Sequence, residues 1–584
     1  MKIKLDENLP LRLATVLKDL GHDVELFRRR GGQVMYRAPL LALICVLPLA
    51  TATLAQHGHH GDEDSVGWVP REILQRPVAL RKGIGKINDP VTTSSPEAQA
   101  FYNQGLAYLH SYVWIEAARS CNQALRSDPK LALAYVCLSR AYSGLEDQGA
   151  AQSALENAQS LAPNLSERER LRVSLRATQL EAIKDILNSN KHQIYKAAID
   201  AALAKYPDDP ELWLLRGNAE EPTAAGRGQR GLVGAVAYYQ AVLAISPDNP
   251  AAEHYLVHTF ETIGHPEEAA KHGEIYARLC PSVPHAQHMY GHDLRILGRS
   301  DEAIVQFRKA DALELSYYES EKIPARYDWH RIHNLDLMAG SYEFKGQVKQ
   351  AEELLREFFL LPANDGLWAS YQVDWPRFLL SRGRYAEALS AAGEMTQGKF
   401  PLQRSMGHLF AGRALVALNR ANEAQQELAK AEKESENVPE SDPEPLMPQP
   451  RRVLDGQRNI LRGEIALRKG NTAEANAQLN EVMNRFVVAK GSGDGVNYLF
   501  TMLYIAQQAR SADDWDLAEI ATKQMLSFDP SYAGGHYVAA VVAEHKGDSA
   551  TARRELTAAE RLWGQADPEF PEVLHVHKKL AGLR

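Results

Sequence analysis

The feature that most constrains this chain is the recurrence of small and large side chains every 34 residues. Small residues allow two helices to approach closely, and the proline that closes a period cannot continue a helix. A period of this length predicts helix pairs stacked as a solenoid, because 584 residues exceed what one compact core holds. The clearest copy is Gly105, Ala117, Ala124 and Pro129, which are followed 34 positions later by Ser139, Ala151, Ala158 and Pro163.

This pattern resembles the tetratricopeptide repeat (TPR), which has a large residue at position 4, small residues at positions 8, 20 and 27, and proline at position 32. About ten copies, some degenerate, are expected between residues 96 and 565. The resemblance implies an all-α fold of helix–turn–helix units in a right-handed superhelix. It also implies that a concave groove binds a protein or peptide and that the protein is not an enzyme. Later copies are marked by Gly217, Ala269, Gly291, Ala303, Ala351, Ala388, Gly412, Ala424, Gly463, Ala475, Ala518 and Ala552.

The repeat array is expected in two halves, residues 96–435 and 453–584. Between them, residues 436–452 read ENVPESDPEPLMPQPRR, and so many prolines exclude a helix pair, which predicts a loop or hinge. The last segment, 571–584, is expected to cap the stack. Within the first half, Ser166 and Glu169 have the spacing of a capping box, which predicts a helix start.

Residues 35–55 have the pattern of a secretory signal, with a basic start, a short apolar run and small residues before the expected cleavage point after Ala55. The mature protein is therefore expected to be periplasmic or secreted, with no stable membrane span, or anchored in the membrane if the signal is not cleaved. A flexible leader containing His57, His59 and His60 is expected over residues 56–95.

A signal at residue 35 is unusual, and we expect translation to start at Met35, with residues 1–34 a fragment or a misassigned start. Residues 1–24 include the sequences DENLP and GHDV. They resemble the opening of PIN-like toxin nuclease domains, in which the acidic pair, here Asp6 and Glu7, helps to hold a divalent metal. The later acidic motifs of that family are missing, so no nuclease activity is expected.

Histidines recur at the groove-facing positions of two adjacent repeats. His254 and His288 lie 34 residues apart at repeat position 5, and His258 and His292 repeat the relation at position 9. An i, i+4 spacing places both histidines of a helix on one face. The candidate groove residues are therefore His254, His258, Glu261, His285, His288, His292, Arg295 and His333.

Three interpretations of this cluster stay open. His254, His258, His288 and His292 could coordinate zinc or copper, which imidazole suits. The groove could instead bind a peptide or a small carboxylate with the help of Arg295. The histidines could also be structural, hydrogen-bonded to one another or to Glu261 and Asp293.

A second resemblance concerns residues 254–261 and 285–292. Secreted bacterial TPR proteins carry an H-Y-x-x-H-x-x-E helix followed by H-x-x-H-M-P-x-H. Here Tyr290 and Gly291 replace the proline and its neighbour. The resemblance supports a functional groove without naming its ligand, and residues 329–334 could extend the same groove.

Composition excludes several other functions. The net charge of −8 and the pI near 6.2 argue against a nucleic-acid partner. The sequence has no HExxH zinc-protease motif, no GxSxG hydrolase elbow and no CxxC pair. Cys121 and Cys137 fall at positions of neighbouring repeats that could meet, either as buried thiols or as a disulfide. The leading prediction is an extracytoplasmic, non-enzymatic scaffold that binds a protein or peptide and needs no cofactor, and the alternative is a zinc- or copper-binding protein.

Overall fold

The computed structural model describes residues 2–6, 23–27, 69–362, 366–438, 450–486 and 495–582. The chain divides into two compact units, Met1–Trp68 and Val69–Arg584. In the first unit, strands β1 (Lys2–Asp6) and β2 (Asp23–Phe27) pair in parallel. Glu7 and the predicted signal at 35–55 lie outside the described residues. No helix in the described part of the chain is long and apolar enough to cross a membrane.

The described part of the second unit is helical and contains no strand. Its first half has α2 (Arg71–Leu74), α3 (Pro96–Leu109), α4 (Trp114–Ser127), α5 (Ala132–Gly144), α6 (Gln148–Leu161), α7 (Glu167–Ile183), α8 (Ser189–Lys205), α9 (Pro210–Asn218), α10 (Val233–Ile245), α11 (Pro250–Thr262), α12 (Pro266–Leu279), α13 (Pro284–Ile296) and α14 (Ser300–Glu321). It continues with α15 (His330–Phe344), α16 (Val348–Leu360), α17 (Gly366–Tyr371), α18 (Asp374–Ser381), α19 (Tyr385–Met395), α20 (Pro401–Ala417) and α21 (Ala421–Ser435). The remaining helices are α22 (Pro450–Arg468), α23 (Thr472–Phe486), α24 (Gly495–Ser511), α25 (Trp515–Phe528), α26 (Ala533–His545), α27 (Ser549–Leu562) and α28 (Pro571–Gly582).

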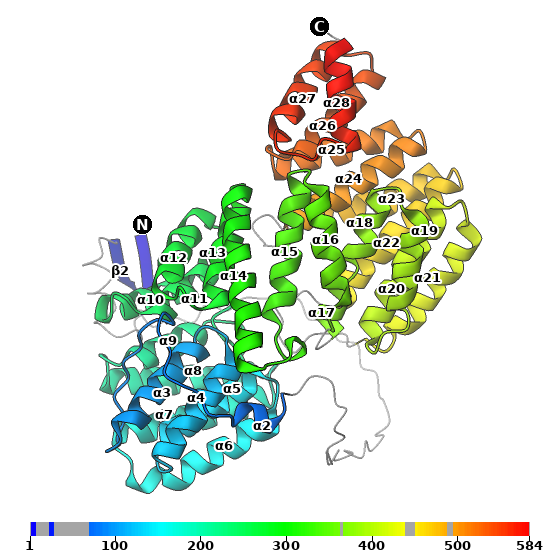
Figure 1. Ribbon diagram of the computed structural model, residues 1–584. Coiled ribbons are helices and arrows are strands. Elements are labelled where there is room, and N and C mark those ends of the chain that lie inside the picture. The colour runs from blue at the N-terminus through cyan, green and yellow to red at the C-terminus, as the bar shows by residue number, and fades with distance from the viewer. Residues whose placement is uncertain are drawn as a thin grey trace, which may run out of the picture. The chain divides into compact units, whose positions relative to one another are not determined.

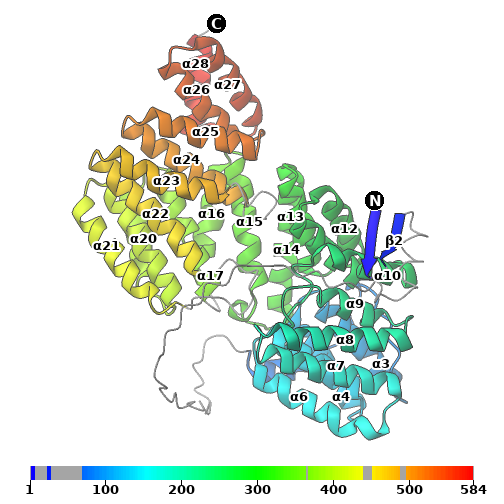
Figure 2. The same ribbon diagram turned by 180° about the vertical axis from the view of Figure 1, so that it is seen from behind.

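Consecutive helices pack as pairs, and each pair packs on the next, as Figure 1 and Figure 2 show from opposite sides. The small residue at repeat position 8 faces the large residue at position 24 of the same repeat. A Cβ atom added to Gly105 would lie 2.3 Å from Cys121 Sγ, and one added to Gly463 would lie 2.6 Å from Leu479 Cγ. The predicted fold class, an all-helical solenoid of TPR-type pairs, is therefore confirmed.

Helix starts follow from local capping chemistry. Asp209 and Asn249 accept backbone N–H groups at the starts of α9 and α11, and each is followed by a proline at the first helical position. The predicted capping box of Ser166 and Glu169 is present at the start of α7.

Residues 69–95 differ from the flexible leader that the sequence predicted there. We call them the strap, because they lie along the first repeats with Ile84, Ile87 and Asp89 buried. Gln104 in α3 donates to the Ala79 carbonyl at 3.0 Å and accepts from the Arg81 backbone N–H at 2.7 Å. The apolar side chains and the carboxylate of the strap are buried from solvent because the strap packs against the helices of the array.

The strap also reaches repeats far along the chain. The Ser282 backbone N–H donates to the Gly83 carbonyl at 2.8 Å, and Arg81 forms an ion pair with Glu321 at the end of α14. Gly83 has a left-handed φ of +74°, and a Cβ there would lie 2.4 Å from Ser282 Oγ. The strap therefore connects the first repeat to the repeats around α12–α14.

The predicted loop at 436–452 is bounded by α21, which ends at Ser435, and α22, which begins at Pro450. Residues 439–449 lie outside the described part of the chain, so the loop prediction is not tested there. At the C-terminus, α28 packs on α27, and Val573, Val576 and Leu580 are buried.

Candidate functional site

The structure places the eight candidate groove residues on three neighbouring helices. Two of these helices, α11 and α13, are the first helices of adjacent pairs, and α15 follows them (Figure 1). His254, His258 and Glu261 lie on α11, whereas His285, His288, His292 and Arg295 lie on α13, and His333 lies on α15.

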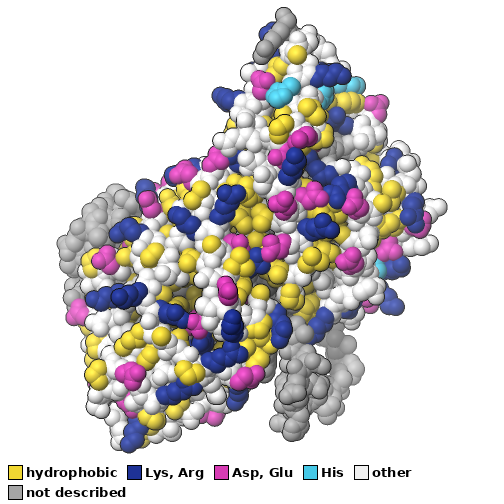
Figure 3. Space-filling model, in the orientation of Figure 1, with side chains coloured by type: hydrophobic (Ala, Val, Ile, Leu, Met, Phe, Trp, Pro, Cys, Tyr) yellow, Lys and Arg dark blue, Asp and Glu magenta, His cyan; other side chains and the backbone are white. Residues whose placement is uncertain are grey.

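These histidines are enclosed by the chain, whereas the sequence placed them at groove-facing positions of the repeat. His254, His285 and His288 are 0%, 2% and 4% exposed, and the side chains of His258 and His292 are 13% and 12% exposed. On the face in Figure 3, histidines appear over the C-terminal helices but not over α12–α14. Another part of the chain buries these histidines, because the connection between α3 and α4 packs against α11.

Tyr112, in this connection, lies against three of the histidines. Its ring centroid lies 4.5 Å from that of His254, 5.2 Å from that of His285 and 5.8 Å from that of His258. The residue has a φ of 58°, in the left-handed region that non-glycine residues rarely adopt. Its hydroxyl donates to the Arg227 carbonyl at 2.9 Å, which fixes the ring over the histidines.

Three imidazole nitrogens converge below this ring. His254 Nε2 lies 3.0 Å from His285 Nε2 and 3.1 Å from His258 Nε2. The ligand atoms of the three residues all lie within 4.8 Å of one another. We call His254, His258 and His285 the histidine triad. Burial, reinforced by the neighbouring imidazoles, holds the pKa of His254 and of His285 well below the usual range.

Of the four histidines that the sequence proposed as one metal site, His254 and His258 belong to the triad, whose third member is His285, at repeat position 2. His288 Nδ1 instead lies 3.1 Å from Asn334 Oδ1 on α15, and burial lowers the pKa of His288 to about 3. Helix periodicity predicts which histidines share a helix face. The orientation of each ring depends on the residue that it contacts in the folded protein.

A second cluster adjoins the triad. The carboxylate of Glu261 pairs with His292 Nδ1 and lies 3.4 Å from His258 Nδ1. Burial opposes ionisation of Glu261, but His292 and His258 outweigh it and hold its pKa well below the usual range. Asp293 is fully buried, and burial reinforced by Glu261 raises its pKa well above the usual range. Glu261 is therefore the ionised carboxylate and Asp293 the neutral one.

The two remaining candidates lie at the edge of these clusters. Arg295 donates to Asn497 at 3.2 Å, which connects α13 to α24. The ring of His333 lies 4.8 Å from that of His288, and burial with neighbouring positive charges holds the pKa of His333 well below the usual range. Arg295 therefore contacts the array's own chain.

Sequence reasoning missed the residues that cover and complete the site. His110 and Tyr112 come from the connection of the first repeat, about 140 positions before α11. No short-range pattern indicates that contact. A third group of Glu314, Asp328 and His330, with ligand atoms within 4.8 Å, lies beside the triad through the ring of His330, 5.0 Å from that of His285. His330 falls in the segment that the sequence analysis placed at the groove.

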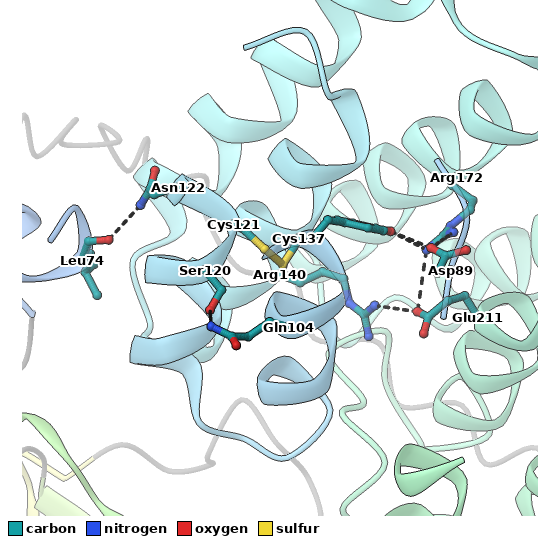
Figure 4. The surroundings of a disulfide bond; sticks show 11 residues. Leu74, Asp89, Gln104, Ser120, Cys121, Asn122, Cys137, Arg140, Arg172 and Glu211 are labelled. Carbon is teal, nitrogen blue, oxygen red and sulfur yellow. Dashed lines mark hydrogen bonds and ion pairs between the residues drawn. A yellow bond between two sulfur atoms is a disulfide. The ribbon is translucent and has the colours of Figure 1, made fainter. Parts of the chain in front are cut away.

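A disulfide joins the first two repeats. Cys121 of α4 and Cys137 of α5 form this bond, with their Cα atoms 6.4 Å apart, so the disulfide alternative applies (Figure 4). The same region holds a buried charge network, in which Asp89 of the strap pairs with Arg172 of α7 and Glu211 of α9 accepts from Arg140 (Figure 4). Cys280 is a buried free thiol.

Comparison with known proteins gives similarity at the level of the fold. No family model matches the sequence, and no curated protein matches it. A TPR protein from Parabacteroides merdae ATCC 43184 is 14% identical with a TM-score of 0.32, over 49% of this chain and 99% of its own. The apo form of the quorum sensor NprR from B. thuringiensis is 12% identical with a TM-score of 0.37, over 66% and 94%.

A human IFIT1 dimer with PPP-AAAA is 13% identical with a TM-score of 0.36, over 74% of this chain and 90% of its own. These similarities concern the helical-repeat architecture alone. They do not support the resemblance of residues 1–24 to PIN-like nuclease domains.

Proposed function

We propose that this chain is an extracytoplasmic helical-repeat scaffold that binds a protein or peptide partner. The predicted groove is filled at α11 and α13 by the enclosed histidines, so the proposal places the partner on another surface. The observation that carries it is a cleft of about 760 Å³ between the strap and the connections that precede α9 and α11.

The lining of this cleft suits a polypeptide better than a small molecule. Small-molecule sites are mostly apolar, whereas this cleft presents Lys86, Lys205, Asp208 and Asp248, all exposed and of both signs. Ile245, which is 39% exposed, adds an apolar contact at its rim. Alternating charges with an apolar anchor match the side chains of an extended segment.

The extracytoplasmic part of the proposal rests on the Cys121–Cys137 disulfide and on the signal pattern at 35–55. Disulfides persist in oxidising compartments and are rare in the cytosol. N-terminal sequencing of the protein from its native cells is expected to give Gln56 as the first residue. Recovery of residues 1–34 in the mature protein would contradict both the start at Met35 and signal cleavage.

Site-specific photo-crosslinking tests the cleft. A benzophenone side chain at Asp248 is expected to trap a polypeptide from the extracytoplasmic fraction, because this residue lies exposed in the cleft. The same group at Glu394, which is exposed on α19 outside the cleft, serves as the control. The adduct should disappear in the Lys86→Glu, Lys205→Glu double variant. Equal trapping at both positions, or an adduct insensitive to charge reversal, would reject the cleft as the partner site.

A further inference from the structure

The histidine triad has the spacing of a metal site. In a tetrahedral zinc site with bonds of about 2.0–2.1 Å to nitrogen, two ligand atoms lie about 3.3 Å apart. The two measured separations, from His254 Nε2 to His285 Nε2 and to His258 Nε2, are 3.0 and 3.1 Å. These two separations are close to those that a bound ion would impose, and the ligand atoms of all three residues lie within 4.8 Å of one another.

The proton on His254 is fixed by its other contact. His254 Nδ1 lies 2.6 Å from the carbonyl oxygen of His110, which can only accept a hydrogen bond. Nδ1 must therefore donate. In the neutral ring this leaves Nε2 as a bare lone pair that faces the other two histidines.

The same reasoning applies to His258. Its Nδ1 faces the carboxylate of Glu261 at 3.4 Å, and that carboxylate is held on its other side by His292. A carboxylate oxygen can accept the ring N–H, and with the His258 proton on Nδ1 its Nε2 also carries a lone pair. Two lone pairs that face each other at 3.1 Å repel unless a proton or a metal ion lies between them.

His285 can supply the third lone pair. Its Nδ1 is buried and has no hydrogen-bond partner among the described residues, and its Nε2 lies 3.0 Å from His254 Nε2. With the ring proton on Nδ1, its Nε2 lone pair points at His254 Nε2. We propose that the Nε2 atoms of His254, His258 and His285 bind one late first-row divalent ion, Zn²⁺ or Cu²⁺.

The donor set selects this class of ion. Neutral imidazoles suit zinc and copper, whereas magnesium and calcium prefer oxygen ligands. The outer contacts match as well, because metal-binding histidines commonly donate their second N–H to a backbone carbonyl or a carboxylate. Here the His110 carbonyl and Glu261 fill these two roles, and Glu261 adds one negative charge close to the ion.

Aromatic rings enclose the site, but the triad provides three of the four ligands of a tetrahedral ion. Tyr112 covers the triad, and its hydroxyl is directed to the Arg227 carbonyl, away from the three nitrogens. On the other side, the ring of Trp329 lies 5.8 Å from that of His285. The described cluster provides three donors, so the fourth position falls to a small ligand such as water, as in zinc sites with three protein ligands.

Metal analysis of the full chain tests the proposal. After treatment with a chelator and equilibration with Zn²⁺ or, separately, Cu²⁺, the protein is expected to retain one ion by mass spectrometry. Competition with a chromophoric chelator gives the affinity. His258→Gln and His285→Gln should each lower it at least about tenfold, and Glu261→Gln about 10–100-fold, the usual effect of losing an outer hydrogen bond.

Two controls locate the ion. His272→Gln removes an imidazole on α12 whose Nδ1 lies 2.6 Å from Glu253 and which is outside the triad, so the affinity should not change. Replacement of His57, His59 and His60 removes the other histidine-rich segment of the sequence and should also leave one ion bound. If a triad variant does not fold by circular dichroism, the absorption spectrum of the Co²⁺-loaded wild type reports the geometry instead.

Each alternative result overturns the proposal. Wild-type protein that retains no ion would mean that a proton, shared between His254 and its neighbours, occupies the position. An ion retained equally by His258→Gln and His285→Gln, or lost with His57, His59 and His60, would lie elsewhere. A Co²⁺ spectrum of six-coordinate character would exclude the tetrahedral arrangement of imidazoles.

Discussion

At the scale of single residues, this solenoid buries charged side chains beside groups of opposite charge. Glu211 is 2% exposed and lies 2.8 Å from His110 Nε2, 3.4 Å from Arg140 and 3.7 Å from Arg172. Burial opposes its ionisation, but His110 and the two arginines outweigh that effect and hold the pKa of Glu211 well below its ordinary value of 4.5. The carboxylate is therefore ionised in the folded protein over the whole physiological range.

We predict that Glu211→Gln destabilises the protein by about 3–5 kcal/mol near pH 7, because buried Arg172 and Arg140 lose their carboxylate partner. Glu211 has a depressed pKa in the folded state, so its contribution is present above the unfolded pKa and lost as pH falls through the folded pKa. The difference between wild type and variant should therefore shrink below about pH 4.5. Urea unfolding at several pH values measures both effects.

The control for this prediction is Glu423→Gln. Glu423 pairs with Arg420 three residues earlier on the exposed surface of α21, where solvent screens the interaction. Its substitution should leave the urea midpoint unchanged at each pH. A Glu211→Gln variant as stable as Glu423→Gln would mean that the buried network contributes nothing to stability.

The histidines show what the sequence can and cannot predict at this scale. The i, i+4 spacing of His254 and His258 correctly predicts a shared helix face, because that relation is local. Their burial and their ring orientations depend on His110 and Tyr112, which come from the first repeat. A contact across that separation leaves no periodic signal, so spacing alone could not indicate that His285 lies beside His254 and His258.

At the scale of helices, the close approach within a pair depends on a small residue at repeat position 8, which is glycine in the pair of α22 and α23. We predict that Gly463→Ala destabilises the protein by about 1–3 kcal/mol, because the added Cβ would lie 2.6 Å from Leu479 Cγ. Gly456 lies on the same helix, α22, with nothing within 4 Å of an added Cβ. Gly456→Ala should instead stabilise it by up to about 1 kcal/mol, the helix propensity difference.

Thermal unfolding of the two variants beside wild type measures this contrast. Shifts in the same direction would show that packing at position 8 does not limit the approach of α22 and α23. This element-level contact is one that the sequence does predict, because the repeat places Gly463 and Leu479 sixteen residues apart, at the same spacing as Gly105 and Cys121.

The disulfide also acts between elements, since it joins α4 to α5 across a sequence separation of 16 residues. We predict that reduction lowers the free energy of unfolding by about 3 kcal/mol, the usual value for a loop of this size. Chemical unfolding with and without reductant measures the change, and peptide mapping identifies the bond. Two free thiols at Cys121 and Cys137 in protein from the extracytoplasmic fraction would contradict the assignment.

At the scale of the molecule, the strap closes part of the array, because it connects the first repeat to the repeats around α12–α14. We predict that Gly83→Val loosens this closure, because its side chain would meet Ser282 Oγ. Hydrogen exchange should rise in the strap and in the connection between α12 and α13. Gly547→Val is the matched control, since Gly547 has the same φ of +74° but nothing within 4 Å. Equal exchange of the 279–285 region in both variants would show that the strap does not hold the connection between α12 and α13.

The strap is also the part of the fold that the sequence predicted least well. Its prolines and glycines resemble those of a mobile leader, and they have no period that could indicate a partner. Its order comes from tertiary contacts such as those of Asp89 with Tyr102 and Arg172. Composition indicates the local conformational preference of a segment. Here the buried contacts between the strap and the array determine its conformation instead.

An open repeat protein frays from both of its termini, because each outermost repeat is held by one neighbour only. In this chain the first repeat has a second attachment through Gly83 and Arg81 to residues beyond α12. The C-terminal side has a comparable second attachment, because the Asp567 backbone N–H donates to the Gly346 carbonyl at 3.0 Å and Glu572 of α28 forms an ion pair with Arg382. Fraying of this array from either side would therefore have to break contacts with helices in its middle.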